Sequence, residues 1–324
     1  MFIMLPDSLT LLLWLAAGVA SLFSLLGFLS QVDWKFELFS HFRTQYALLL
    51  CICLLAFLVG GNLPGVMVSL FFLAINVALI LPIYRRITRR EARMKFYRLF
   101  FANILGTNTH YEQLILAIRK TDADTILLVE VRHNHLEQLL PALADYPYQF
   151  TQPDVKNFGL AIFSRLPLGS TQALCFDERC TPALVARLIV DETPLTLVGI
   201  HPYPPKSRTQ AAQRDHQLKL TAEFVRSQPN ELMLAGDLNC SSWSHTFQQL
   251  LKDSHLLDSR QGIGLQPSWP AGNPLLRIPI DHVLYTPGIC IQARKWGQPT
   301  GSDHLPVIVD FSILPSTHAQ GGKK

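Results

Sequence analysis

The chain has 324 residues, a formal net charge of +4 and a hydrophobic share of 49%. A mean hydropathy of +0.22 is high for a soluble protein, so we expect the apolar residues to be concentrated in one region. The six cysteines include no pair of Cys-x-x-Cys units, which argues against a structural zinc site.

Apolar residues gather in three runs near the N-terminus, at residues 9–29, 45–60 and 63–83. The first run carries no charge and is about 20 residues long, enough for a helix to cross a hydrocarbon core of roughly 30 Å. A cleaved secretory signal is the alternative, but such signals begin with basic residues, and no Lys or Arg precedes this run. The sequence therefore predicts three membrane spans and contact with a lipid bilayer.

A basic segment follows the third run, "YRRITRREARMKFYR" at residues 84–98. Its net charge is +6, so the rest of the chain sums to −2. Because Lys and Arg beside membrane spans favour the cytoplasmic side, we expect a multi-pass protein of the inner cell membrane with a cytoplasmic C-terminal domain. A periplasmic or extracellular domain is the alternative, and Cys175 and Cys180 favour it if they form a disulfide.

Three regions are expected: a transmembrane region with its basic segment at 1–96, a globular domain at 97–315 and a disordered tail at 316–324. Strand-like runs lie at residues 96–105, 125–131, 158–165, 183–190, 195–201, 231–239, 280–286 and 306–313, and helical runs at 110–121 and 208–228. Short β-rich runs covered by helices predict an α+β fold, a four-layer α/β/β/α sandwich of two packed sheets with outer helices.

Acids, amides and histidines fall where the apolar runs meet turns. These residues are Asn103, Glu130, His201, Asp237, Asn239, Asp281, Asp303 and His304. Each one alone is explained by helix capping or turn formation. Together they offer oxygen donors that a hard divalent ion binds, and imidazoles that contact phosphate or transfer protons near neutral pH. The set predicts a metal-dependent phosphoester hydrolase.

Seven segments resemble, in the same order, those of the endonuclease/exonuclease/phosphatase superfamily, which includes DNase-like nucleases, sphingomyelinases and inositol-polyphosphate 5-phosphatases. They are "FFANIL", "ADTILLVEV", "GLAIFSRLPL", "LVGIHPYPP", "LMLAGDLNCSSWS", "PIDHVLYT" and "GSDHLPVIVDF". The resemblance covers about residues 97–313. Apurinic endonucleases carry a Tyr and Asn segment where this chain has "IHPYPP", and this difference argues against abasic-site cleavage.

The resemblance implies a metal and phosphate site. Glu130 would be the principal ligand of Mg²⁺, with Mn²⁺ as the alternative ion, and Asn103 and Asp303 would support it. Asn103, Asn239 and His201 would contact the phosphate of the substrate. The metal would polarise the phosphoryl oxygens and acidify a water molecule.

The resemblance also implies catalytic roles. Asp237 would orient and deprotonate the attacking water, with Asn239 positioning the phosphate. Asp281 would hold His304, which stabilises the phosphorus centre or assists the leaving oxygen, and His201 would act as an acid. Four other residues in or near the matched segments are expected to be structural or to support the site: Asn108, Ser164, Arg165 and His282.

Charge and hydropathy together narrow the substrate. Outside the basic segment the chain is slightly acidic, which counts against nucleic acid, because nuclease affinity comes largely from Lys and Arg contacts to phosphates. Membrane spans favour a lipid-linked phosphoester. The chain resembles a membrane-anchored bacterial branch that includes teicoplanin-resistance membrane proteins, which implies a polyprenyl pyrophosphate substrate and an outward-facing catalytic domain.

Three functions are therefore compared. The first is a membrane-anchored phosphoesterase that hydrolyses a polyprenyl pyrophosphate or a phospholipid headgroup. The alternatives are a membrane-associated nuclease and a catalytically inactive binding module on the same fold. No sequence feature predicts a protein partner.

Overall fold

The computed structural model describes residues 5–85, 95–154, 156–176 and 180–314. The chain divides into two compact units: Met1–Arg85 with Cys240–Gln248, and Arg86–Asn239 with Gln249–Lys324. Most of the basic segment, at 86–94, and the tail predicted to be disordered lie outside the described residues.

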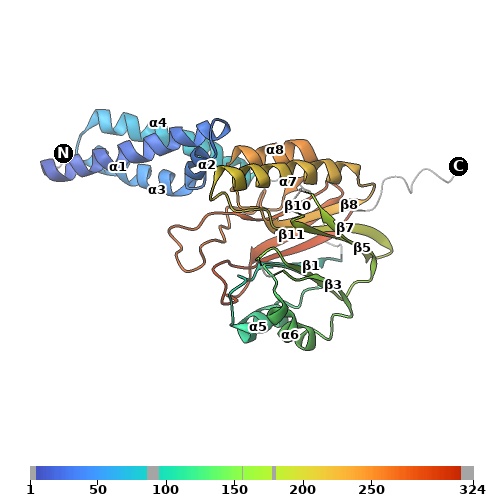
Figure 1. Ribbon diagram of the computed structural model, residues 1–324. Coiled ribbons are helices and arrows are strands. Elements are labelled where there is room, and N and C mark those ends of the chain that lie inside the picture. Colours follow the sequence, from blue (N-terminus) through green and yellow to red (C-terminus); the bar gives the residue numbers. More distant parts are fainter. Residues whose placement is uncertain (1–4, 86–94, 155, 177–179, 315–324) are drawn as a thin grey trace. The chain divides into compact units, whose positions relative to one another are not determined.

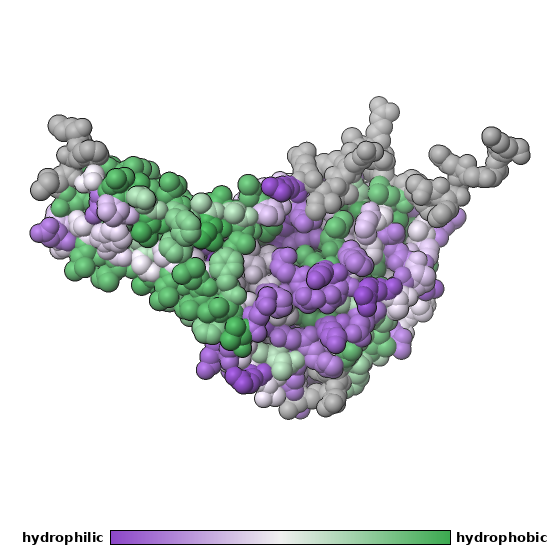
Figure 2. Space-filling view, turned by 90° about the horizontal axis from the view of Figure 1, so that it is seen from above, coloured by the Kyte–Doolittle hydropathy of each residue, from purple (hydrophilic) through white to green (hydrophobic). Residues whose placement is uncertain are grey.

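The first unit consists of N-terminal helices. They are α1 (Asp7–Leu26), η1 (Gly27–Gln31), α2 (Trp34–Ser40), α3 (Arg43–Val59), α4 (Leu63–Ile80) and η2 (Leu81–Tyr84). Two segments, Asp7–Gln31 and Leu63–Tyr84, are long and apolar enough to cross a membrane. A third crossing requires α2 and α3, bent by 54°, to act as one span. Figure 2 shows a largely hydrophobic surface on these helices, which is consistent with membrane anchoring.

A buried polar cluster joins α1, α3 and α4. The Arg43 guanidinium, only 2% exposed, donates to the Ser24 carbonyl at 2.7 Å, and Asn76 Nδ2 donates to Ser24 Oγ at 2.8 Å. A Cβ on Gly27 would lie 2.6 Å from Arg43 Nη2, so the absence of a side chain there makes room for the guanidinium. These contacts hold three apolar helices in one register, since a buried polar group without a partner is costly.

The second unit contains two six-stranded sheets. The first has the order β11-β12-β1-β2-β4-β3 and the second β5-β6-β7-β8-β10-β9. The first sheet comprises β1 (Tyr97–Asn103), β2 (Thr125–Val129), β3 (Tyr148–Gln152), β4 (Leu160–Ser164), β11 (Ile289–Trp296) and β12 (Val307–Ile313). The second comprises β5 (Leu168–Cys175), β6 (Pro182–Val190), β7 (Thr193–Ile200), β8 (Glu231–Asp237), β9 (Leu257–Asp258) and β10 (Asp281–Tyr285).

Helices cover the outer faces of both sheets (Figure 1). They are α5 (Tyr111–Thr121) and α6 (His133–Ala142) on the first sheet, and α7 (Arg208–Ser227) on the second. Of α8 (His245–Ser254), residues 249–254 belong to this unit and lie on the second sheet as well. Leu127, Leu197 and Val283 belong to the core between the sheets, whereas Ile118 and Leu139 bury α5 and α6 against the first sheet. The predicted four-layer sandwich is confirmed.

The strand-like runs of the sequence correspond to the inner strands. Sequence periodicity missed the strands β3, β5, β9 and β11 and the helices α6 and α8. β3 and β5 are edge strands with mostly exposed side chains, and β9 has two residues. Such strands lack the continuous apolar character of strands buried on both faces.

The strand directions bring the predicted polar residues to one end of the sandwich. β1 runs parallel to β2, and β7 runs parallel to β8, so their carboxyl ends point the same way within each sheet. β10 is antiparallel to β8 with Asp281 opposite Asp237, which places the start of β10 beside the end of β8.

Candidate active site

The residues that follow β2 and β8 have strained backbones. Glu130, directly after β2, has a φ of 63°, and Asn239, two residues past the end of β8, has a φ of 50°. Left-handed conformations are uncommon for residues other than glycine and concentrate at functional sites. The Gly106 amide donates to Glu130 Oε2 at 2.9 Å and fixes the carboxylate. The turns therefore aim both side chains in set directions.

Asn103, the last residue of β1, lies between two carboxylates. Its Nδ2 donates to Glu130 Oε1 at 2.9 Å and to Asp237 Oδ2 at 3.1 Å, and its Oδ1 accepts from the Leu105 amide at 3.0 Å. The side chain is 1% exposed, so its orientation is determined by these three contacts. The amide thus bridges the two sheets, because β1 and β8 belong to different ones.

His201, which follows β7, faces the same pair of carboxylates. Its Nδ1 lies 3.0 Å from the carbonyl of Asn157, an acceptor, so this nitrogen carries the proton. Its Nε2 lies 3.7 Å from Asp237 Oδ2 and 3.9 Å from Glu130 Oε1. The geometry directs Nε2 toward the space between the carboxylates.

His304 forms a close pair with Asp281. Its Nδ1 lies 2.8 Å from Asp281 Oδ2, and its Nε2 lies 3.6 Å from Asp237 Oδ2. Burial alone would lower the pKa of His304, but the charges of Asp281 and Asp237 raise it to about 10. Burial would raise the pKa of Asp281, but the charge and hydrogen bond of His304 lower it. The pair is therefore an imidazolium and a carboxylate at neutral pH.

Asp237 is the buried carboxylate at the centre of the site. It is 2% exposed, and burial raises its pKa to about 6, against the opposing effect of His304. The Asn239 amide donates to its other oxygen, Oδ1, at 3.0 Å. A carboxyl with this pKa is largely ionised at neutral pH and still basic enough to accept a proton.

Two predicted residues stand further from this centre. Asn239 donates its side-chain Nδ2 to the Pro202 carbonyl at 3.0 Å. Asp303 has a half-exposed side chain, with Oδ1 4.0 Å from His304 Nε2 and Oδ2 accepting from Trp269 Nε1 at 2.8 Å. Asp237 is the centre of the predicted set. Each of the other seven predicted residues contacts Asp237 directly or contacts a residue that does.

The donor set suits a hard divalent cation. Among the described residues, Asp237, Asp281 and His304 offer ligand atoms within 4.8 Å of one another, a different group from the predicted Glu130, Asn103 and Asp303. His304 Nδ1 already donates a hydrogen bond to Asp281, so these two groups are paired with each other without a metal ion. Glu130 and Asp237 share Asn103 and approach the same His201 nitrogen, and a cation would compensate their charges.

Several contributing residues were not predicted. Asn157 orients His201, Trp269 holds Asp303, and Ser302 Oγ accepts from the His304 amide at 3.1 Å while donating to the Asn103 carbonyl at 2.8 Å. Ser302 lies in the "GSDHLP" segment, so proximity to His304 was a usable signal. Asn157 and Trp269 are far from their partners in the sequence, so no local signal pointed to them.

The four residues expected to be structural contact other groups. Asn108 donates to the Thr300 carbonyl, Ser164 contacts Thr125, and Arg165 forms surface ion pairs with Asp122 and Asp145. His282, on the strand position next to Asp281, lies 2.8 Å from Arg260 through its Nδ1. Successive strand residues point to opposite faces, which separates His282 from the site.

A comparison with protein families assigns the chain. The model of the endonuclease/exonuclease/phosphatase family matches residues 100–304, which include all eight predicted site residues. The chain belongs to this family. Members of the family are phosphoester hydrolases, typically dependent on a divalent metal, and include nucleases and sphingomyelinases. A search of the curated proteins found no match.

Solved structures of the family share the fold. An endonuclease/exonuclease/phosphatase from Beutenbergia cavernae has a TM-score of 0.58 and 20% identity, covering 68% of this chain and 72% of its own. Sphingomyelinase C from Streptomyces griseocarneus has a TM-score of 0.52 and 20% identity, and the match covers 67% of this chain and 99% of its own. D. rerio TDP2 complexed with a single-strand DNA product has a TM-score of 0.57 and 15% identity, and the match covers 68% of this chain and 100% of its own. At these identities the likeness concerns the fold alone.

Proposed function

We propose that the protein is a membrane-anchored, magnesium-dependent phosphohydrolase whose substrate is a lipid-linked phosphoester or pyrophosphate. The convergence of Glu130, Asn103, Asp237, His201 and His304 carries the hydrolase proposal. The apolar helices in the same chain support an amphiphilic substrate, since its phosphate lies at the level of the lipid headgroups.

The proposed reaction uses the ionisation states of the site. Asp237 accepts a proton from the attacking water, since its carboxyl is ionised above a pKa of about 6. The His304 imidazolium, held by Asp281, donates to an oxygen of the phosphorus centre and stabilises its negative charge. His201 Nε2 and the Asn103 amide are placed to orient the phosphate.

The metal would be held by oxygen donors at the same place. We assign Glu130 as its principal ligand, with Asn103 and Asp303 in support and Asn239 positioning the phosphate. When bound, Mg²⁺ supplies charge that polarises the phosphoryl oxygens and acidifies water. The carboxylates of Glu130 and Asp237, which approach one His201 nitrogen, support this assignment.

A substrate panel tests the proposal. Purified full-length protein in detergent is incubated with polyprenyl pyrophosphate, phospholipid and DNA, each with Mg²⁺ and with a chelator. We expect phosphate release from a lipid substrate that the chelator abolishes and added Mg²⁺ restores. Cleavage of DNA alone would instead support the nuclease alternative, and turnover of none would support the inactive binding module.

We further propose that the second unit faces an oxidising compartment. Cys175 and Cys180 form a disulfide, and disulfides persist mainly outside the cytoplasm. This differs from the expectation based on the arginine distribution. A cysteine added at the C-terminus, in intact cells, should react with a membrane-impermeant maleimide. Labelling only after permeabilisation would restore the cytoplasmic assignment.

A further inference from the structure

A cavity of about 650 Å³ in the second unit is lined in part by Phe158, whose ring packs near that of the site residue His201. Its wall includes the aromatic rings of Phe158 and Tyr203 and the apolar side chains of Pro153 and Leu174. Ligand pockets typically measure about 300 to 1,000 Å³, so the cavity has room for a substantial part of a substrate.

Phe158 connects this cavity to the catalytic residues. Its ring centre lies 4.5 Å from that of Tyr203 and 5.7 Å from that of His201. The preceding residue, Asn157, accepts the hydrogen bond from His201 Nδ1 at 3.0 Å. The same short segment thus forms the cavity wall and orients His201, whose Nε2 lies 3.7 Å from Asp237 Oδ2. A phosphate bound by His201 would therefore have the cavity next to it.

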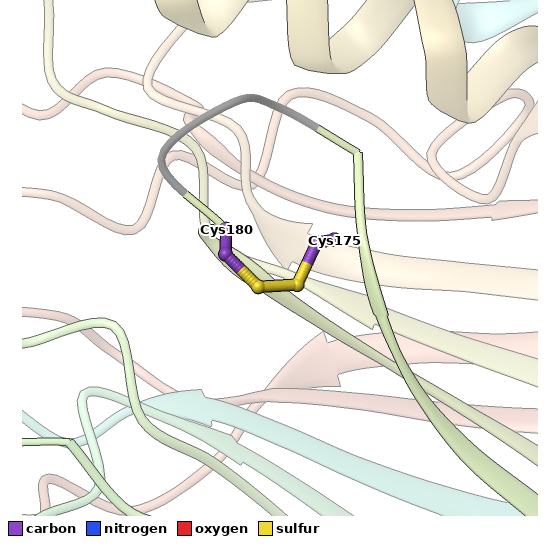
Figure 3. Close-up of a disulfide and its surroundings, with 2 residues drawn as sticks. All are labelled: Cys175 and Cys180. Carbon is purple, nitrogen blue, oxygen red and sulfur yellow. A yellow bond between two sulfur atoms is a disulfide. The ribbon is translucent and has the colours of Figure 1, made fainter.

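A disulfide forms another part of the wall. Cys175 is the last residue of β5, and Cys180 lies two residues before the start of β6. Figure 3 shows the bridge linking the two ends of the connection between these strands. Cys175 pairs with Pro182 in the β5–β6 ladder. Cys175, Cys180 and Pro182 all line the cavity. The bridge holds Cys175 and Cys180 together at this part of the wall.

Among the described residues, the lining carries no net charge. The charged residues among them are Asp154 and Lys156, of opposite sign, and the others are apolar or uncharged. A nucleic acid strand would need several basic contacts to its phosphates, and the described lining residues offer one basic side chain, Lys156. Part of the wall is polar, with Gln152 and Thr181 beside the two charged residues. The aromatic and aliphatic part suits an uncharged hydrocarbon chain, which gains free energy by leaving water.

We propose that Phe158, Tyr203 and the Cys175–Cys180 bridge form a subsite for the hydrocarbon chain attached to the scissile phosphate group. The inference rests on the proposed function, because it assigns a place to the lipid part of that substrate. Phe158 and Tyr203 are then specificity-determining residues, and the disulfide is a positioning element of the subsite.

Direct binding measurements test the subsite independently of turnover. Prenyl phosphonates with one, two or three isoprene units are titrated calorimetrically into the full-length protein in detergent with Mg²⁺. We expect affinity to rise at least about fourfold with each isoprene unit, because one buried methylene alone contributes about fourfold and each unit carries five carbons. In Phe158→Ala and Tyr203→Ala, the affinity for the longest phosphonate should fall by about tenfold or more, and the dependence on chain length should flatten.

Tyr148→Ala is the matched control, since this exposed tyrosine on β3 is not part of the lining and its loss should leave the chain-length dependence intact. Equal weakening of all three phosphonates by Phe158→Ala would overturn the subsite and leave Phe158 with only a role in orienting His201. Affinities of the unsubstituted protein that do not depend on chain length would also overturn it.

The disulfide is tested with the Cys175→Ser/Cys180→Ser double variant and, separately, with reductant on the unsubstituted protein. Both should weaken binding of the longest phosphonate more than that of the shortest. If chain length governs binding but neither a prenyl pyrophosphate nor a phospholipid is hydrolysed, the proposed function is wrong and the subsite stands. If lipids are hydrolysed but binding does not depend on chain length, the subsite is wrong and the proposed function stands.

Discussion

Single side chains in the site differ in how their protonation is set. Burial raises the pKa of Asp237, whereas the buried His304 is kept protonated by Asp281 and by Asp237 itself. One carboxylate therefore serves as a candidate base, while another stabilises a candidate acid. Such divergence between neighbouring ionisable groups is typical of acid and base catalysis.

The role of Asp237 predicts a large kinetic effect. Asp237→Asn keeps the size of the side chain but removes the proton acceptor, so kcat should fall by about 10²- to 10⁴-fold. The rate is measured on whichever substrate the panel identifies. Asp122→Asn is the control, because it alters an exposed ion pair with Arg165 and should leave kcat unchanged. A loss of only a few-fold for Asp237→Asn would contradict the assignment.

The Asp281–His304 pair predicts a change in pH dependence. The pKa of His304 is raised to about 10, so its charged form is present at neutral pH and is lost as the pH rises through about 10. Asp281→Asn removes the largest favourable charge, and the loss of activity on raising the pH should begin at a lower pH. The measurement is kcat against pH for both proteins at saturating Mg²⁺. Identical alkaline limbs would show that this pair does not control the rate.

At the level of elements, the two pairs of parallel strands place the site. β8 ends in Asp237 and β7 is followed directly by His201, and the close approach of the two strands depends on Gly236. A Cβ at this position would collide with the carbonyl of Ile200, the residue before His201. The glycine of "LAGDLN" is therefore explained by the spacing of the two strands that carry these residues.

Gly236→Ala should consequently disturb the site. The added methyl group has to separate β7 from β8, which we expect to cost about 1 to 3 kcal/mol of stability and to reduce kcat by displacing Asp237 from His201. Gly272→Ala is the control, because its Cβ would meet no atom within 4 Å. Thermal unfolding and kcat are measured on both variants. Equal behaviour of the two would contradict the steric explanation.

At the level of the whole molecule, the number of membrane crossings decides where the termini lie. Asp7–Gln31 and Leu63–Tyr84 are sufficient for two crossings, and the bent pair α2 and α3 would make a third. With two crossings the N-terminus and the second unit share a side, and with three they lie on opposite sides. The predicted three spans and the proposed outward second unit together require an inward N-terminus.

Labelling at both ends of the chain tests this arrangement. With three spans, a cysteine added at the N-terminus should resist a membrane-impermeant maleimide in intact cells, while one at the C-terminus should react. Both should react after permeabilisation, which is the control for accessibility. Reaction of both cysteines in intact cells would indicate two spans, with α2 and α3 not crossing the membrane.

The sequence by itself was sufficient for the local features. Apolar periodicity located the inner strands, α5, α7 and the long apolar helices, because a strand or helix buried in a core or bilayer carries that pattern in consecutive residues. The polar residues at strand ends were found in the same way, and the family model matches the region that contains them.

Only the tertiary structure decided which of these residues meet. Asn157 beside His201 and Trp269 beside Asp303 lack a local pattern that requires the pairing. These contacts depend on strand order and on loop paths between segments, and the edge strands and cavity arise from the same long-range packing. Hydrophobic periodicity reports which face of a segment is buried, whereas the neighbour on that face is set by the fold.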